Sequence, residues 1–169
     1  MSESFGISGG GRSAEELFRQ MTGAATAERA AQGDALLDGH PVEVKRATSV
    51  TLNQVRAVKY LPLVVHYAPA DDWYVVPAHV VVAGVSQKRR GQHTENPFES
   101  ATLSLTNLHT WKVDDARRLR EATLEAIAAS DRYPELRSAM KDVLRESRDL
   151  ADASLERVRE LLHRLGLGT

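Results

Sequence analysis

Two short apolar runs meet at the turn Asp38-Gly39-His40, and this strand–turn–strand pattern constrains the fold more than any other feature of the chain. Residues 33–37 precede the turn, and residues 41–45 follow it with valines at alternate positions. An Asp-Gly pair between two such runs is a strong signal for a β-hairpin. We therefore expect an antiparallel pair of strands in which Val42 and Val44 face a core and the other face carries polar side chains.

The segments around the hairpin alternate between helical and strand patterns. Ser13 followed by Glu16 forms a capping box, which predicts the start of a helix. Composition and apolar periodicity predict further helices over residues 24–32, 51–60 and 78–87, from 114 onward and over 135–165, and strands over 63–67 and 73–76. We therefore expect an α/β fold with a small central mixed β-sheet flanked by helices and a C-terminal helical extension.

The length of 169 residues fits one domain, which we divide into three regions. The Ser- and Gly-rich residues 1–12 predict a disordered N-terminal arm, and residues 13–113 form the core, with a polar, basic loop over 86–112. Residues 114–169 form a helical region that packs on the core, on a second subunit, or on both. The continuous pattern over 135–165 predicts a helix of about 46 Å, longer than such a domain needs, so we expect a homodimer.

The composition excludes several classes of protein. Without cysteine, the chain has no disulfide framework, no thiolate zinc site and no thiol nucleophile. The longest apolar run, Val80 to Val85, is far shorter than the roughly 20 residues that cross a bilayer, and the first residues lack a signal-peptide pattern. We therefore expect a cytoplasmic protein with no membrane partner. The chain contains neither a Walker A loop nor a Rossmann glycine pattern, so we expect no nucleotide cofactor.

Asp34, Glu43 and Lys45 are the candidate chemical groups of the hairpin. Glu43 and Lys45 share one face of their strand, and strand pairing brings Asp34 beside Glu43. Two carboxylates offer the hard oxygen ligands that Mg²⁺ prefers, with Mn²⁺ as a substitute. An ammonium beside them can stabilise a phosphorane or position an attacking water. A Glu-x-Lys pair on an exposed strand is also common as a solvated ion pair of little energetic worth.

These residues, in this order, resemble the motif of the PD-(D/E)xK nuclease superfamily, which includes many restriction endonucleases and archaeal Holliday-junction resolvases. The motif corresponds to Gly33-Asp34 followed by Glu43-Val44-Lys45, and the resemblance covers roughly residues 13–85. Gly33 stands where proline is usual. The resemblance implies a restriction-endonuclease-like core, a metal ion bound by both acids and by the Val44 carbonyl, and a catalytic role for the lysine.

The resemblance also implies supporting residues. The superfamily often adds a glutamate from an upstream helix, for which we select Glu16, with Glu15 as the alternative. Gln54 would reach the site from the following predicted helix, as a polar residue does in some relatives. Asp38 is the alternative to Asp34, which we prefer because Asp38-Gly39 forms the predicted turn.

A local excess of positive charge follows the proposed site. Between Lys45 and Val113 there are eight Lys or Arg residues against four Asp or Glu, whereas the whole chain has a net charge of −1. A positive cleft is what a polyanion binder needs, although a basic run is also common on a solvated loop. The residues that we expect to contact nucleic acid are Arg46, Asn53, Arg56, Lys59, Lys88, Arg89, Arg90, Gln92, His93 and Asn96.

These features together predict a Mg²⁺-dependent DNA endonuclease. Site-specific cleavage of the restriction or phage type is favoured over two alternatives. One is a structure-selective nuclease of the Holliday-junction type, and the other is a DNA-binding module of the same fold that has lost activity. An RNA-cleaving toxin would carry the same residues, so the sequence does not distinguish it from the DNA endonuclease.

Overall fold

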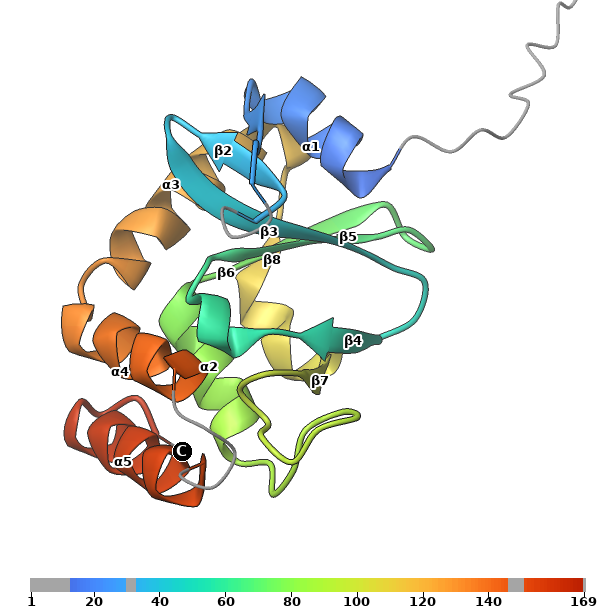
Figure 1. The fold of residues 1–169 in the computed structure, drawn as a ribbon. Helices are drawn as coiled ribbons and strands as arrows, with labels where there is room; N and C mark the ends of the chain where they lie inside the picture. Colours follow the sequence, from blue (N-terminus) through green and yellow to red (C-terminus); the bar gives the residue numbers. More distant parts are fainter. Residues whose placement is uncertain (1–12, 30–32, 146–150, 169) are drawn as a thin grey trace, which may run out of the picture.

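The computed structural model describes residues 13–29, 33–145 and 151–168 of the chain. It is an α/β protein with a mixed central sheet flanked by helices, which confirms the predicted fold class in its coarse form (Figure 1). The predicted N-terminal arm, residues 1–12, lies outside the described residues.

The main sheet has six strands, and all neighbouring strands are antiparallel except β3 and β5, which are parallel. In spatial order the strands are β1 (Ala25–Thr26), β2 (Ala35–Leu37), β3 (His40–Ala47), β5 (Leu63–Tyr67), β6 (Asp72–Val76) and β8 (Lys112–Val113). A second sheet pairs β4 (Thr51–Val55) with β7 (Ala101–Ser104) in antiparallel fashion. The helices are α1 (Ala14–Thr22), α2 (Ala78–Ser86), α3 (Leu119–Ser130), α4 (Pro134–Arg145) and α5 (Ala151–Arg164), with 3₁₀ turns η2 (Ala57–Lys59), η3 (Leu105–Trp111) and η4 (Ala116–Arg118).

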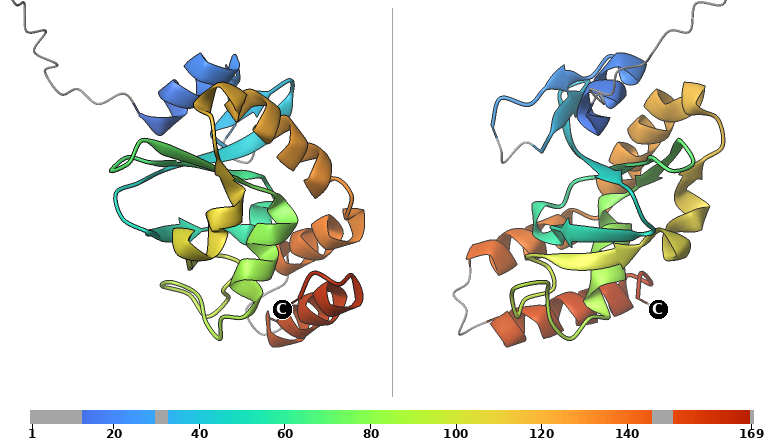
Figure 2. Two further views of the ribbon diagram at one scale, coloured as in Figure 1. Left: turned by 180° about the vertical axis from the view of Figure 1, so that it is seen from behind. Right: turned by 90° about the vertical axis from the view of Figure 1, so that its right-hand side faces the viewer.

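Alternation along the strands divides the buried side chains between the two faces of the main sheet. Val42, Val44 and Val64 pack with α1 and α3 on one face. Val65 and Val76 pack on the other face with α2, α4, α5 and the β4–β7 pair. The hairpin and α1 therefore lie at one end of the molecule and α5 at the other, as both views of Figure 2 show.

Several local predictions are confirmed. The hairpin pairs Ala35 with Val42 and Leu37 with His40 in antiparallel register. Helix α1 begins after Ser13, whose hydroxyl accepts a hydrogen bond from the backbone N–H of Glu16 at 3.2 Å. The strands predicted over 63–67 and 73–76 and the helix predicted over 78–87 are β5, β6 and α2, within one residue at their ends.

The helix predicted over 51–60 is wrong, because these residues form β4 and η2. They lie in the connection between two parallel strands, β3 and β5, where a helix is usual. Here β4 finds a partner in β7, nearly fifty residues later in the chain, and the strand pairing overrides the local helical periodicity. The Ala-rich stretch 24–32 is also not helical where it is described, since Ala25–Thr26 form β1.

The single helix predicted over 135–165 is also wrong. Two helices, α4 and α5, occupy this region and pack against each other, and residues 146–150 between them lie outside the described part of the chain. Met140 of α4 and Val158 of α5 are fully buried in the same core, so the apolar stripes of both helices are covered within one chain. The homodimer prediction therefore loses the long helix on which it rested.

Candidate active site

Asp34 is held against strand β3 by two hydrogen bonds. Its backbone N–H donates to the Val42 carbonyl at 2.9 Å, and its side-chain Oδ2 accepts from the Val44 backbone N–H at 2.8 Å. Ala35 and Val42 are the last paired residues of the hairpin, so Asp34 lies one position beyond the paired residues, beside the β3 backbone at Val44. The structure thus brings together the two acids that the motif separates by nine positions.

Glu43 and Lys45 are fixed on the same strand by its parallel pairing with β5. The backbone N–H of Glu43 donates to the Pro62 carbonyl at 3.0 Å, and Lys45 pairs in register with Val65. The side chains of Glu43 and Lys45 are partly buried. Val42, which precedes Glu43, and Val44, which lies between the two, are buried. The expected alternation of polar and apolar faces on this strand is confirmed.

Gly33 allows the chain to enter the hairpin at this point. Its φ is +75°, and a Cβ atom built there would lie 2.5 Å from the Val42 carbonyl oxygen and 2.9 Å from Cδ1 of Leu61. Proline fixes φ near −65°, so the proline that is usual in the superfamily motif does not fit this backbone. The departure from the motif at this position therefore has a conformational cause.

The other acid of the hairpin, Asp38, is already paired. Both of its carboxylate oxygens accept hydrogen bonds from Nη2 of Arg120 on α3, each at 2.8 Å. The same guanidinium donates through Nη1 to the Thr22 carbonyl at 2.6 Å. Asp38 thus connects the turn to α3 and α1, whereas the carboxylate of Asp34 contacts the β3 backbone at Val44.

Glu15 is the acid of α1 whose pKa is influenced by these carboxylates. Burial, followed by the nearby carboxylates of Asp34 and Glu43, raises the pKa of Glu15 above its usual range, and Arg19 opposes this rise. Glu16 is exposed and lines a separate shallow hollow with residues of β1. Neighbouring positions on a helix differ by about 100° in direction, so only the orientation of α1 on the sheet separates the two.

Glu15→Gln is expected to raise the thermal stability of the metal-free protein at pH 7.5. The pKa of Glu15 is higher in the folded protein than in the unfolded chain. Glu15 therefore contributes favourably to the free energy of unfolding below its unfolded pKa, and this contribution is lost as the pH rises through its folded pKa. The neutral glutamine avoids both the burial of a charge and the repulsion by Asp34 and Glu43, and we expect a gain of roughly 1–3 °C in Tm at pH 7.5 that disappears near pH 4.

Thermal melting in EDTA at the two pH values, followed by circular dichroism, measures this effect. Glu16→Gln is the matched control, because it removes the same charge from the same first helical turn. Equal shifts for the two variants would show that the helix terminus, rather than the facing carboxylates, determines the stability change.

Lys59 forms an ion pair with Glu43 that the sequence did not reveal. Its Nζ lies 3.1 Å from Oε2 and 3.4 Å from Oε1 of the carboxylate. The basic charges from Arg46 to Lys59, with no acid between them, predict that Lys59 contacts nucleic acid, and this pattern contains no signal for a pair with Glu43. The pair joins η2 to β3 beside the candidate catalytic groups.

The donor chemistry of the site suits a hard divalent cation. Glu15, Asp34 and Glu43 offer carboxylate oxygens, and the backbone of Val44 runs beside Asp34. Burial, and after it the nearby carboxylates of Asp34 and Glu43, raises the pKa of Glu15, and a cation would offset the part that comes from negative charge. As the described side chains are placed, no three of the type His, Asp or Glu form a group that could hold a metal ion.

The basic loop is attached to β4 through Gln92. The side-chain Oε1 of Gln92 accepts from the backbone N–H of Gln54 at 2.7 Å, and its Nε2 donates to Oδ1 of Asn53 at 3.3 Å. Gln54 has a φ of +52° and lies where the β4–β7 register shifts. It is therefore an exposed residue of a β-bulge rather than part of a helix, and no contact described for it joins it to the carboxylates.

The other predicted nucleic-acid residues fall into two groups. Asn96 is buried, with its Oδ1 accepting from the Phe98 backbone N–H at 2.9 Å, and Arg56 donates to the Glu99 carbonyl at 3.4 Å. The remaining basic residues are exposed or partly exposed: Arg46, Lys88, Arg89, Arg90 and His93. Three of them line an open hollow of about 390 Å³ together with Gln92 and Thr102.

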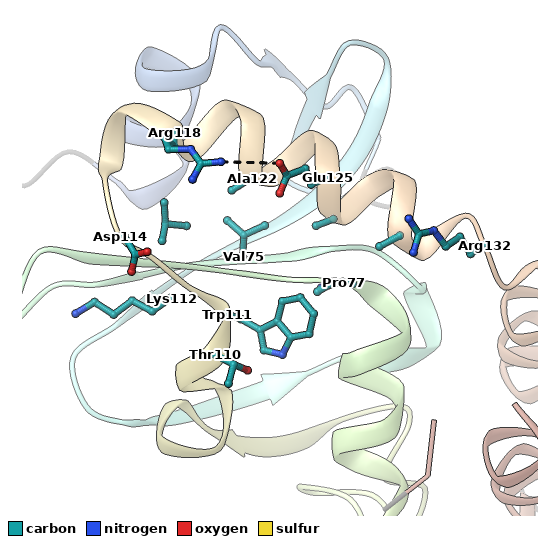
Figure 3. A pocket seen from close by; sticks show the side chains of 13 residues that line it. Val75, Pro77, Thr110, Trp111, Lys112, Asp114, Arg118, Ala122, Glu125 and Arg132 are labelled. Atoms are coloured by element: carbon teal, nitrogen blue, oxygen red, sulfur yellow. Dashed lines mark ion pairs between the residues drawn. The ribbon is translucent and has the colours of Figure 1, made fainter. Parts of the chain in front are cut away.

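A larger hollow of about 500 Å³ lies between α3 and the segment around β8 (Figure 3). Trp111 and Pro77 form part of its wall, and Arg118 and Arg132 lie toward its two ends. Arg118 is already paired with Glu121 and Glu125. None of the residues predicted for the site lines this hollow, so it is separate from the hairpin.

The chain matches no family model, no curated protein and no solved structure. Among the described helices, none combines the length and apolar character needed to cross a membrane.

Proposed function

We propose that the chain is a metal-dependent DNA endonuclease with a restriction-endonuclease-like core. The observation that carries this proposal is the position of Asp34, whose carboxylate is held on β3 by the N–H of Val44, the residue that follows Glu43. Lys45 lies two positions after Glu43 on β3. Glu15 on α1 is influenced electrostatically by both acids. Carboxylates and an ammonium on adjoining elements are groups that can support metal-dependent hydrolysis of a phosphodiester.

Each group has a role that its chemistry dictates. The carboxylates of Glu15, Asp34 and Glu43 would hold Mg²⁺ or Mn²⁺, which supplies Lewis-acid stabilisation and a more acidic water when bound. The Lys45 ammonium donates hydrogen bonds to the negative phosphate oxygens as charge builds on them, or orients the attacking water. In the hydrolysis, the water oxygen bonds to phosphorus, one phosphorus–oxygen ester bond breaks, and the departing oxygen takes up a proton.

The exposed basic residues supply the affinity for the polyanion. Arg89 and Arg90 protrude from a loop that Gln92 attaches to the β4 bulge, so the loop has a fixed base on the second sheet. Arg46 is exposed on β3 immediately after the catalytic lysine. Phosphate contacts of this kind position a duplex without selecting its sequence.

Cleavage assays on two substrates test the proposal. Supercoiled plasmid and a four-way DNA junction are each incubated with Mg²⁺, with Mn²⁺ and with EDTA. We expect cleavage with either metal ion and none with EDTA; discrete plasmid fragments would indicate site-specific cutting, and cleavage of the junction alone would indicate structure selectivity. Salt-sensitive binding without cleavage on any substrate would favour an inactive binding module, and the absence of both would overturn the nucleic-acid assignment.

A further inference from the structure

Lys59 engages the carboxylate of Glu43, one of the three acids assigned to the metal ion. Its ammonium lies within 3.5 Å of both carboxylate oxygens, at 3.1 and 3.4 Å. When an ammonium contacts both oxygens of a carboxylate, it compensates most of the negative charge of that carboxylate. Resting on the proposed function, we infer that Lys59 is a masking residue, which holds Glu43 in the metal-free protein and competes with the metal ion for it.

The ion pair is not a loose surface contact. The side chain of Lys59 is 22% exposed and that of Glu43 is 17% exposed. Charges in such surroundings are less screened by water and salt than those of a fully exposed pair, so their attraction is larger. A cation that binds Glu43 must therefore displace a well-held ammonium.

The backbone that carries Lys59 is fixed on both sides. The N–H of Val58 donates to the Phe98 carbonyl at 2.9 Å, and the N–H of Tyr60 donates to the Ala57 carbonyl at 3.0 Å. The Tyr60 hydroxyl is anchored by donating to the Ser130 carbonyl at 2.9 Å. Because the turn is held in place, the backbone of Lys59 is fixed at a point from which its ammonium reaches Glu43.

The negative charges around the site favour a positively charged side chain there when no metal ion is bound. The pair between Lys59 and Glu43 lies beside Asp34, whose carboxylate is held at Val44, so two carboxylates come close together on β3. Lys59 offsets part of this negative charge in the metal-free state. When a divalent cation takes Glu43, the ammonium is released, and the phosphate groups of a nucleic acid are the partners that its charge then favours. Lys59 thus links the occupancy of the metal site to the presence of substrate.

Isothermal titration of the DNA-free protein with Mn²⁺ tests the masking role without a cleavage assay. Lys59→Gln is expected to bind Mn²⁺ roughly five- to tenfold more tightly than the unmodified protein, because no ammonium competes for Glu43. Lys59→Arg keeps the positive charge and is expected to bind like the unmodified protein. Melting curves followed by circular dichroism show that each variant is folded.

Lys112→Gln is the matched control. Lys112 also pairs with an acid, Asp72, at 2.9 Å, but this pair joins β8 to β6 and does not involve the site. Lys112→Gln removes the same positive charge from the chain as Lys59→Gln. Any general effect of net charge on cation binding therefore appears in both variants. We expect the Mn²⁺ affinity of Lys112→Gln to stay within about twofold of the unmodified protein.

The outcomes separate the masking role from the proposed function. Equal or weaker Mn²⁺ binding by Lys59→Gln would overturn the masking role while leaving a metal-dependent nuclease in place. Binding by Lys59→Gln together with none by the unmodified protein would support the masking role in its strongest form. Absence of Mn²⁺ binding in every folded variant would overturn both.

Discussion

Asp34→Asn is expected to lower the rate of DNA cleavage by roughly 10²–10³-fold or more, while the protein keeps its fold. The asparagine has the same size, and its side-chain oxygen can still accept the hydrogen bond from the Val44 N–H that Asp34 accepts at 2.8 Å. The substitution therefore removes a negative charge from the site and little else. Single-turnover cleavage with Mg²⁺ in excess measures the rate of the chemical step directly.

Asp38→Asn is the control for this prediction, because Asp38 is the other acid of the hairpin. Its carboxylate binds Arg120 on α3 at the turn and does not face Glu43. We expect this variant to keep cleavage within a few-fold of the unmodified protein, with a modest loss of stability from the exposed ion pair. Loss of cleavage in Asp38→Asn together with full activity in Asp34→Asn would reverse the assignment of the first acid.

Gly33→Ala is expected to destabilise the protein by about 3 kcal/mol, the sum of a left-handed backbone cost and of overpacking in a tight site. The added methyl group would lie 2.5 Å from the Val42 carbonyl oxygen, which is backbone of the central hairpin and has little room to move. In a chain of this length the loss corresponds to roughly 6–12 °C in Tm. Thermal and urea-induced unfolding both report it.

Gly39→Ala separates the two causes. Gly39 has a φ of +82°, close to the +75° of Gly33, but no atom lies within 4 Å of the position that its Cβ would take. We expect a loss of about 1 kcal/mol, from backbone conformation alone. If the free energy of unfolding fell by the same amount in both variants, the close approach of Gly33 to Val42 would make no contribution to the loss.

The local part of the site could be predicted because neighbouring residues determine it. The Asp-Gly turn and the alternating valines fix the hairpin, and the pairing of Ala35 with Val42 brings Asp34 alongside residues 42–44 of β3. The specific pairing did not depend on any distant part of the chain. For the same reason, the N-terminus of α1 follows from Ser13 and its hydrogen bond to Glu16.

Contacts between distant segments could not be predicted in this way. Residues 51–55 form a strand because β7 pairs with them, and their bulge is held by Gln92, 38 residues after Gln54. Lys59 meets Glu43 across 16 residues because η2 turns the chain back toward β3. No local periodicity contains this information, since each contact depends on where the sheet places the two segments.

The break between α4 and α5 has the same origin. Both helices are amphipathic, and their combined apolar positions predict one long helix when the sequence is considered alone. A straight helix of that length would leave the core, whereas two packed helices bury Met140 and Val158 together. The choice depends on the size of the core, which is a property of the whole fold.

Arg120 binds both the Asp38 carboxylate and the Thr22 carbonyl. This link sets a limit on how far the chain could be shortened and stay active. Arg120 belongs to α3, and Leu119 beside it is fully buried in the core that contains Val42 and Val44. A polypeptide ending before α3 would carry every proposed catalytic group and yet expose the apolar back of the strand that holds them. Any attempt to transplant or miniaturise this site would therefore have to include α3, although α3 contributes no group to the chemistry.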